Sequence, residues 1–74
     1  MKELDMVALT RDLPVHGLRA GDVGAVVHSY GVESYEVEFV RTDGNTVAVV
    51  TLAPKDVRPL EGAEILHARR LASA

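Results

Sequence analysis

Cysteine and tryptophan are absent from this chain of 74 residues, and its only aromatic side chains are two tyrosines and one phenylalanine. Small secreted domains usually depend on disulfides, so the lack of cysteine favours a reducing, cytoplasmic setting. Peptide grooves that bind proline-rich segments need several exposed aromatics. Tyr35 and Phe39 are expected in the core, which leaves Tyr30 alone and argues against such a groove.

Long apolar runs and lysines are also scarce. No stretch approaches the ~20 apolar residues that a membrane-spanning helix needs, and no signal peptide is visible at the N-terminus. The chain has two lysines and a net charge of −3, with nine acidic and six basic residues in 1–60. Nucleic acids are bound through clustered cations, so the sequence weighs against nucleic acid and membrane as main partners.

Short apolar blocks separated by turn signals make up most of the chain. They predict strands at 6–9, 23–30, 34–40, 46–52 and 57–59, with the clearest alternation at 34–40. Residues 53–56 fit one 3₁₀ turn. This order predicts a mainly β fold over residues 1–60: a small SH3-like antiparallel barrel of five strands that hides its edges by closing on itself.

The connection between the first two strands carries proline and glycine, and is predicted to be a loop. Leu13, Val15 and Leu18 are expected to turn from it toward the core. Gly21 can supply a positive φ in the turn that follows. Gly24 marks a place where the second strand can bend or bulge.

Residues 61–74 lack the strand-like pattern of residues 1–60 and are interpreted as a separate C-terminal packing or interaction segment. Acidic residues come early in it and arginines late, which suits a helix dipole. Ile65, Ala68 and Ala72 lie on one helical stripe with Leu71 beside it, so a helix is predicted. An extended conformation of residues 65–71 is the alternative.

Five short motifs stand out between residues 12 and 59. They are Asp12-Leu13-Pro14, His16-Gly17-Leu18, Gly21-Asp22-Val23-Gly24-Ala25-Val26-Val27, Tyr35-Glu36-Val37-Glu38-Phe39 and Asp56-Val57-Arg58-Pro59. Together they resemble a bacterial family of short proteins known as domain of unknown function 4926. The resemblance spans about residues 4–60; it implies a stand-alone SH3-like domain and implies no activity.

The stretch from Gly21 to Val27 is also similar to the KOW element of ribosomal and transcription-elongation proteins. That element usually has basic residues around it, whereas Asp12, Asp22 and Glu33 flank the matching stretch here. A KOW-like nucleic-acid-binding protein is therefore kept as an alternative, with Arg11, Arg19, Arg41 or Arg58 as its phosphate contacts.

No catalytic or cofactor motif is evident, so the chain is expected not to be an enzyme and to need no cofactor or small molecule. The glycines match neither a P-loop nor a dinucleotide fingerprint. The three histidines, His16, His28 and His67, lie 12 and 39 residues apart, unlike closely spaced metal ligands. A metal or enzyme site around His16 or His28 would have to form between subunits.

Two groups of side chains are candidates for contact with another protein. Glu36 and Glu38 project from one face of a strand and could meet a basic partner, with Tyr30 as a nearby exposed aromatic. Ile65, Leu66 and Leu71 must be buried against the barrel, a second copy or another protein. The sequence thus favours a non-enzymatic protein-interaction module, or the small subunit of a complex.

Overall fold

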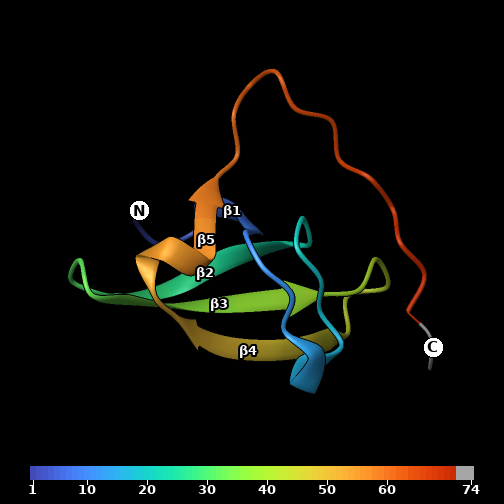
Figure 1. Ribbon diagram of the computed structural model, residues 1–74, viewed down its shortest axis with the longest axis horizontal. Helices are drawn as coiled ribbons and strands as arrows, with labels where there is room; N and C mark the ends of the chain where they lie inside the picture. Colours follow the sequence, from blue (N-terminus) through green and yellow to red (C-terminus); the bar gives the residue numbers. More distant parts are fainter. Residues whose placement is uncertain (72–74) are drawn as a thin grey trace.

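Five antiparallel strands form a single sheet in the computed structural model, which describes residues 1–71 (Figure 1). The strands are β1 (Met6–Leu9), β2 (Val23–Tyr30), β3 (Ser34–Val40), β4 (Thr46–Leu52) and β5 (Val57–Pro59). Two 3₁₀ turns accompany them, η1 (Pro14–His16) and η2 (Pro54–Asp56). The predicted strands and the second turn are confirmed, whereas η1 lies where a plain loop was expected. No helix among the described residues is long and apolar enough to cross a membrane.

The strand order is β4-β3-β2-β1-β5, so the sheet has β4 at one edge and β5 at the other. Figure 1 shows β5 at a steep angle to β2, β3 and β4. The sheet therefore curls, and its core lies on the inner side. The mainly β, five-stranded antiparallel fold is confirmed. The expected closure is not reached, because within residues 1–71 no hydrogen-bonded pairing joins β4 to β5.

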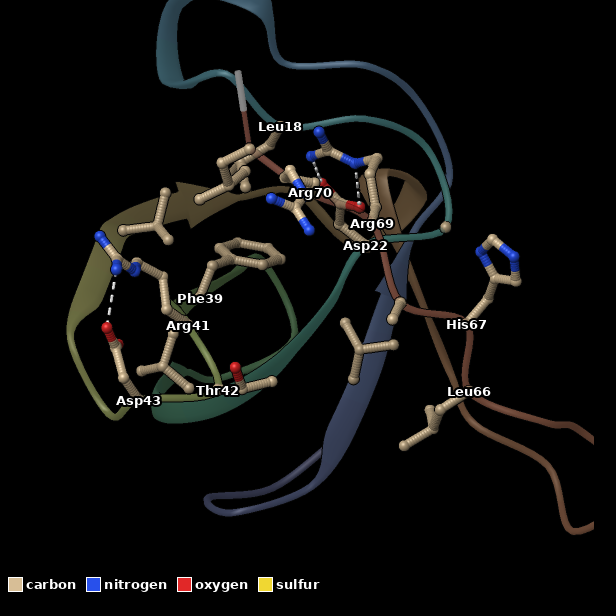
Figure 2. Close-up of a pocket in the computed structure, with 16 residues that line it drawn as sticks. Leu18, Asp22, Phe39, Arg41, Thr42, Asp43, Leu66, His67, Arg69 and Arg70 are labelled. Atoms are coloured by element: carbon tan, nitrogen blue, oxygen red, sulfur yellow. Dashed lines mark hydrogen bonds and ion pairs between the residues drawn. The ribbon is translucent and has the colours of Figure 1, made fainter. Parts of the chain in front are cut away.

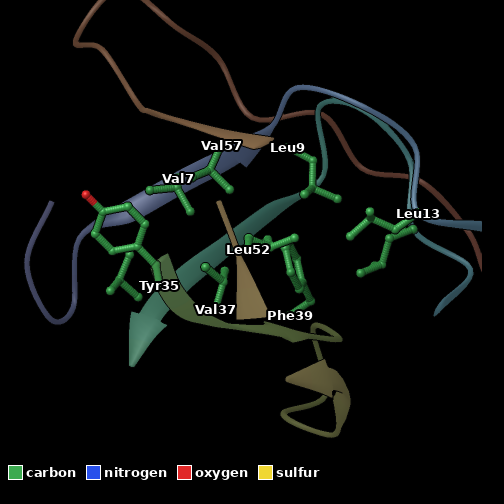
Figure 3. Close-up of a cluster of buried hydrophobic side chains, with 10 residues drawn as sticks. Val7, Leu9, Leu13, Tyr35, Val37, Phe39, Leu52 and Val57 are labelled. Atoms are coloured by element: carbon green, nitrogen blue, oxygen red, sulfur yellow. The ribbon is translucent and has the colours of Figure 1, made fainter. Parts of the chain in front are cut away.

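The core lies inside this curl (Figure 3). Alternation along β3 directs Tyr35, Val37 and Phe39 inward, and each is at most 5% exposed. Leu13 and Leu18 also reach the core, because an isolated bridge between them closes the loop. Val15 does not, contrary to expectation: it lies in η1, beyond that bridge, and is 93% exposed.

Gly24 occupies the tightest position in the sheet. A Cβ atom there would lie 2.7 Å from a methyl carbon of Val37, 2.8 Å from the carbonyl oxygen of Glu38 and 2.9 Å from the ring of Phe39. The irregularity expected at Gly24 occurs elsewhere, since the β2–β3 register shifts between Val26 and His28. Gly24 is therefore required for close packing of β2 on β3.

The C-terminal segment, called the tail from here on, runs without helix or strand from residue 60 to 71. The predicted helix is wrong for these residues, and residues 72–74, including Ala72, lie outside the described part. So short a helix is only marginally stable in water. Glu64 and Arg69, the charges that would have suited its dipole, are instead ion-paired with Arg58 and Asp22 on the sheet domain.

Replacing Gly24 with alanine should destabilise the fold by about 1–3 kcal/mol, the usual cost of forcing extra volume into a packed core. The backbone oxygen of Glu38 cannot move aside as a side-chain end could. Urea unfolding followed by circular dichroism would measure the change. Gly62→Ala is the matched control, because no atom lies within 4 Å of the point that its Cβ would occupy. Equal stability of the two variants would contradict this role for Gly24.

Candidate functional site

The two edges of the sheet differ in how they are protected. β5 has three residues and ends in Pro59, and short strands and prolines discourage pairing with another chain. β4 has seven residues, Thr-Val-Ala-Val-Val-Thr-Leu, with no charge and no proline. A strand at a sheet edge directs half of its backbone N–H and C=O groups away from its neighbour. β4 therefore offers another strand an edge without charged residues or proline.

The loop of residues 10–22 is held beside this edge by η2. Asp56 is 5% exposed and is the only buried charged residue in the described chain. Its carboxylate accepts hydrogen bonds from Nε of Arg11 (2.8 Å) and the backbone N–H of Ala53 (3.1 Å). Thr10 donates to the carbonyl oxygen of Lys55 at 2.7 Å. The Arg11 hydrogen bond outweighs the effect of burial and holds the pKa of Asp56 below its ordinary value.

A groove of about 330 Å³ separates this loop from the C-terminal half of β4. Val50, Thr51 and Leu52 form one wall, and the other wall is the loop from Arg11 to His16. Val15, at the rim, is the exposed apolar side chain that sequence analysis placed in the core. The groove thus has the outer side of an edge strand as one wall and an exposed apolar side chain, Val15, at its rim.

The sheet face opposite the core carries the acidic residues singled out from the sequence. Glu36 accepts a hydrogen bond from the hydroxyl of Thr51, and Glu38 accepts one from the hydroxyl of Thr46 at 2.7 Å. Both acids are half-buried between β2 and β4 rather than freely solvated. Their carboxylates therefore border β4, one strand in from the open edge.

Exposed apolar side chains share this face. Met6, Ala25, Glu38 and Val49 stand in one row across β1, β2, β3 and β4. Val49 is 50% exposed, at the edge. Tyr30 is also 50% exposed and contacts the ring of His28 edge-on at 4.6 Å. Glu36, Glu38 and Tyr30 thus lie on one surface.

The tail is attached to the sheet domain at two places. Near its start, Glu64 makes a bidentate pair with Arg58, at 2.8 and 2.5 Å, and this lowers the pKa of Glu64 to about 2. Near its end, Arg69 makes a bidentate pair with Asp22, at 3.2 and 2.5 Å, and also donates to the carbonyl oxygen of Gly17 (Figure 2). The tail is therefore a strap with two ionic anchors.

Both anchors depend on ionised carboxylates. Partial burial raises the pKa of Asp22, but hydrogen bonds from Arg69 and the Arg19 backbone outweigh it and leave the pKa below its ordinary value. A carboxylate with a lowered folded-state pKa contributes stability above its unfolded-state pKa. That contribution is lost as the pH falls through the folded-state value. Both anchors are intact at neutral pH.

The tail residues predicted to make contacts are not buried together. Ile65 is 93% exposed and Leu66 68% exposed, between the two anchors. Leu71 is half-buried and lines a cavity near Leu18. This group is not part of the acidic face, so the structure separates the sequence candidates into two surfaces.

The histidines and arginines are dispersed. Within residues 1–71 no three histidine, cysteine or acidic side chains are placed to hold one metal ion. His28 lies 3.9 Å from Glu3, and His16 is exposed in η1. Of the arginines considered for phosphate binding, Arg11, Arg41 and Arg58 each pair with a carboxylate of this chain, which would compete with phosphate.

Two features were missed by sequence analysis. The lack of charge in 46–52 was visible, but nothing in a single sequence places that strand at an open edge. The pair between Arg69 and Asp22 joins residues 47 positions apart, and no local pattern predicts it.

Arg69→Gln should release the end of the tail, because it removes the bidentate contact with Asp22. We expect chymotrypsin to cut after Leu66 roughly threefold to tenfold faster, since cleavage follows the population of the open form. Arg70→Gln removes the same charge from the next residue, which has no ion-pair partner within residues 1–71. It should leave the cleavage rate unchanged. Equal rates for both variants would show that the anchor does not hold the tail.

Comparison with known proteins gives one match. No curated protein and no solved structure matches the chain. Residues 3–59, which include all five strands, match the family described as Domain of unknown function (DUF4926). The match covers more than half of the chain and agrees with the resemblance found in the motifs. The chain belongs to this family of domains of unknown function.

Proposed function

We propose that this protein is a non-enzymatic protein-interaction module that binds an extended segment of a partner by adding it as a strand to β4. The observation that carries the proposal is the contrast between the two edges. β5 is short and ends in proline, whereas the seven residues of β4 include no charged residue and no proline. Strand addition supplies affinity through main-chain hydrogen bonds.

The charge around the edge favours a basic partner segment. Glu36 and Glu38 lie on the strand next to β4, and the chain has a net charge of −3. A second copy paired through the same edge would bring its own Glu36 and Glu38 to this surface. A foreign strand with lysine or arginine on its outward positions would complement it. Specificity would come from alternate side chains, one set meeting the acids and the other the groove beside Val15.

The nucleic-acid alternative has less support. Three of its four arginines are paired with carboxylates of the chain, and those carboxylates would repel a phosphate backbone. The metal or enzyme alternative would need a second subunit to complete a site. Neither has an observation in its favour comparable to the open edge.

Selection from a library of random linear peptides on the immobilised full chain tests the proposal. Enriched peptides should alternate apolar and basic residues. In Val49→Lys, the Kd for such a peptide should rise about tenfold or more, which corresponds to ~1.4 kcal/mol. Lysine on an edge strand opposes pairing and would repel basic residues of the peptide.

Val40→Lys is the matched control. Val40 is 53% exposed and lies on β3 rather than at the edge. The substitution changes the net charge by the same amount, so it should leave the Kd within about threefold, a small free-energy change. Absence of any enriched peptide, or equal losses in the two variants, would contradict binding at β4.

A further inference from the structure

A cavity of about 670 Å³ lies between the end of the tail and the sheet domain (Figure 2). Leu18, Phe39 and Val47 are among its apolar lining residues, and Leu71 closes it from the tail. This volume is within the range of ~300–1,000 Å³ usual for small-molecule sites. The tail anchor at Asp22 keeps the cavity assembled.

The charges around the cavity do not balance. Asp22 is paired with Arg69, and Asp43 is paired with Arg41 at 2.7 Å. Arg70 also lines the cavity, and within residues 1–71 it has no hydrogen-bond or ion-pair partner. Figure 2 shows its guanidinium on the side of the tail that faces Phe39. Both acids at the rim are thus paired, and Arg70 is the one arginine of the lining without a partner among residues 1–71.

We propose that this cavity binds a small amphiphilic carboxylate. The apolar part of the ligand would lie against Val47 and Leu71, which are half-buried, and its carboxylate would accept hydrogen bonds from Arg70. Guanidinium groups match carboxylates in geometry as well as charge. An amphiphilic amine would find no free acid, because Asp22 and Asp43 are already paired. This proposal does not rest on the strand-addition function, although Val47 belongs to β4.

Titration of the full-length ¹⁵N-labelled chain with decanoate, below its micelle concentration, tests the proposal by NMR. Saturable shifts are expected at the amides of Leu18, Phe39 and Val47, which lie in the cavity wall. 1-Decanol has the same alkyl chain without the charge and should bind about tenfold more weakly, as for the loss of a charge-assisted hydrogen bond.

Arg70→Gln should weaken decanoate binding by about tenfold, for the same reason. Arg19→Gln is the control: it removes the same charge from an exposed arginine that does not line the cavity, and should leave binding unchanged. Three outcomes would each overturn the proposal: no saturable shifts, decanol binding as tightly as decanoate, or equal effects of the two substitutions.

Discussion

The close approach of β2 and β3 at Gly24 is the constraint on which the rest of the structure depends. The hydrogen atom of this glycine leaves room for a methyl carbon of Val37 and the ring of Phe39, where any side chain would collide. At this point β2 is also paired with β1, through Val7. Gly24 thus keeps β2 in close contact with β3 where β2 also pairs with β1, and β1 and β5 contribute to the core that β3 and β4 support. So short a chain buries only ~60% of the surface that its unfolded form exposes. Its stability therefore depends on close packing of the core.

The curled sheet has two edge strands that differ in length and composition. One is finished by a three-residue strand and Pro59. The other is β4, which has no strand on its outer side and a groove beside its C-terminal half. The side chains of the chain itself fill the core, whereas an edge strand binds through groups that the backbone already provides. The architecture thus directs function to the surface, and the buried Asp56 holds the loop of residues 10–22 as the second wall.

Much of the fold could be predicted because it depends on local patterns. Period-two alternation identified β3, and the Gly21 turn required the positive φ that the structure shows. Long-range features were not predictable in the same way. Whether the sheet closes depends on the spatial approach of β4 and β5, and Val15 was misplaced because the Leu13–Leu18 bridge excludes it from the core. The tail has acidic residues early and arginines late, as a helix dipole favours. Glu64 and Arg69 instead form ion pairs with Arg58 and Asp22.

For the candidate sites too, local features could be predicted from the sequence and long-range features could not. Glu36 and Glu38 could be placed on one face from their spacing, and the structure adds that they border an open edge. The measurement that tests strand addition most directly is an NMR structure of the full chain bound to a selected peptide. Cross-strand backbone contacts are expected between the peptide and residues 46–52, with amides of β4 newly protected from exchange. A peptide bound against the tail or β2, with the β4 amides unprotected, would contradict strand addition.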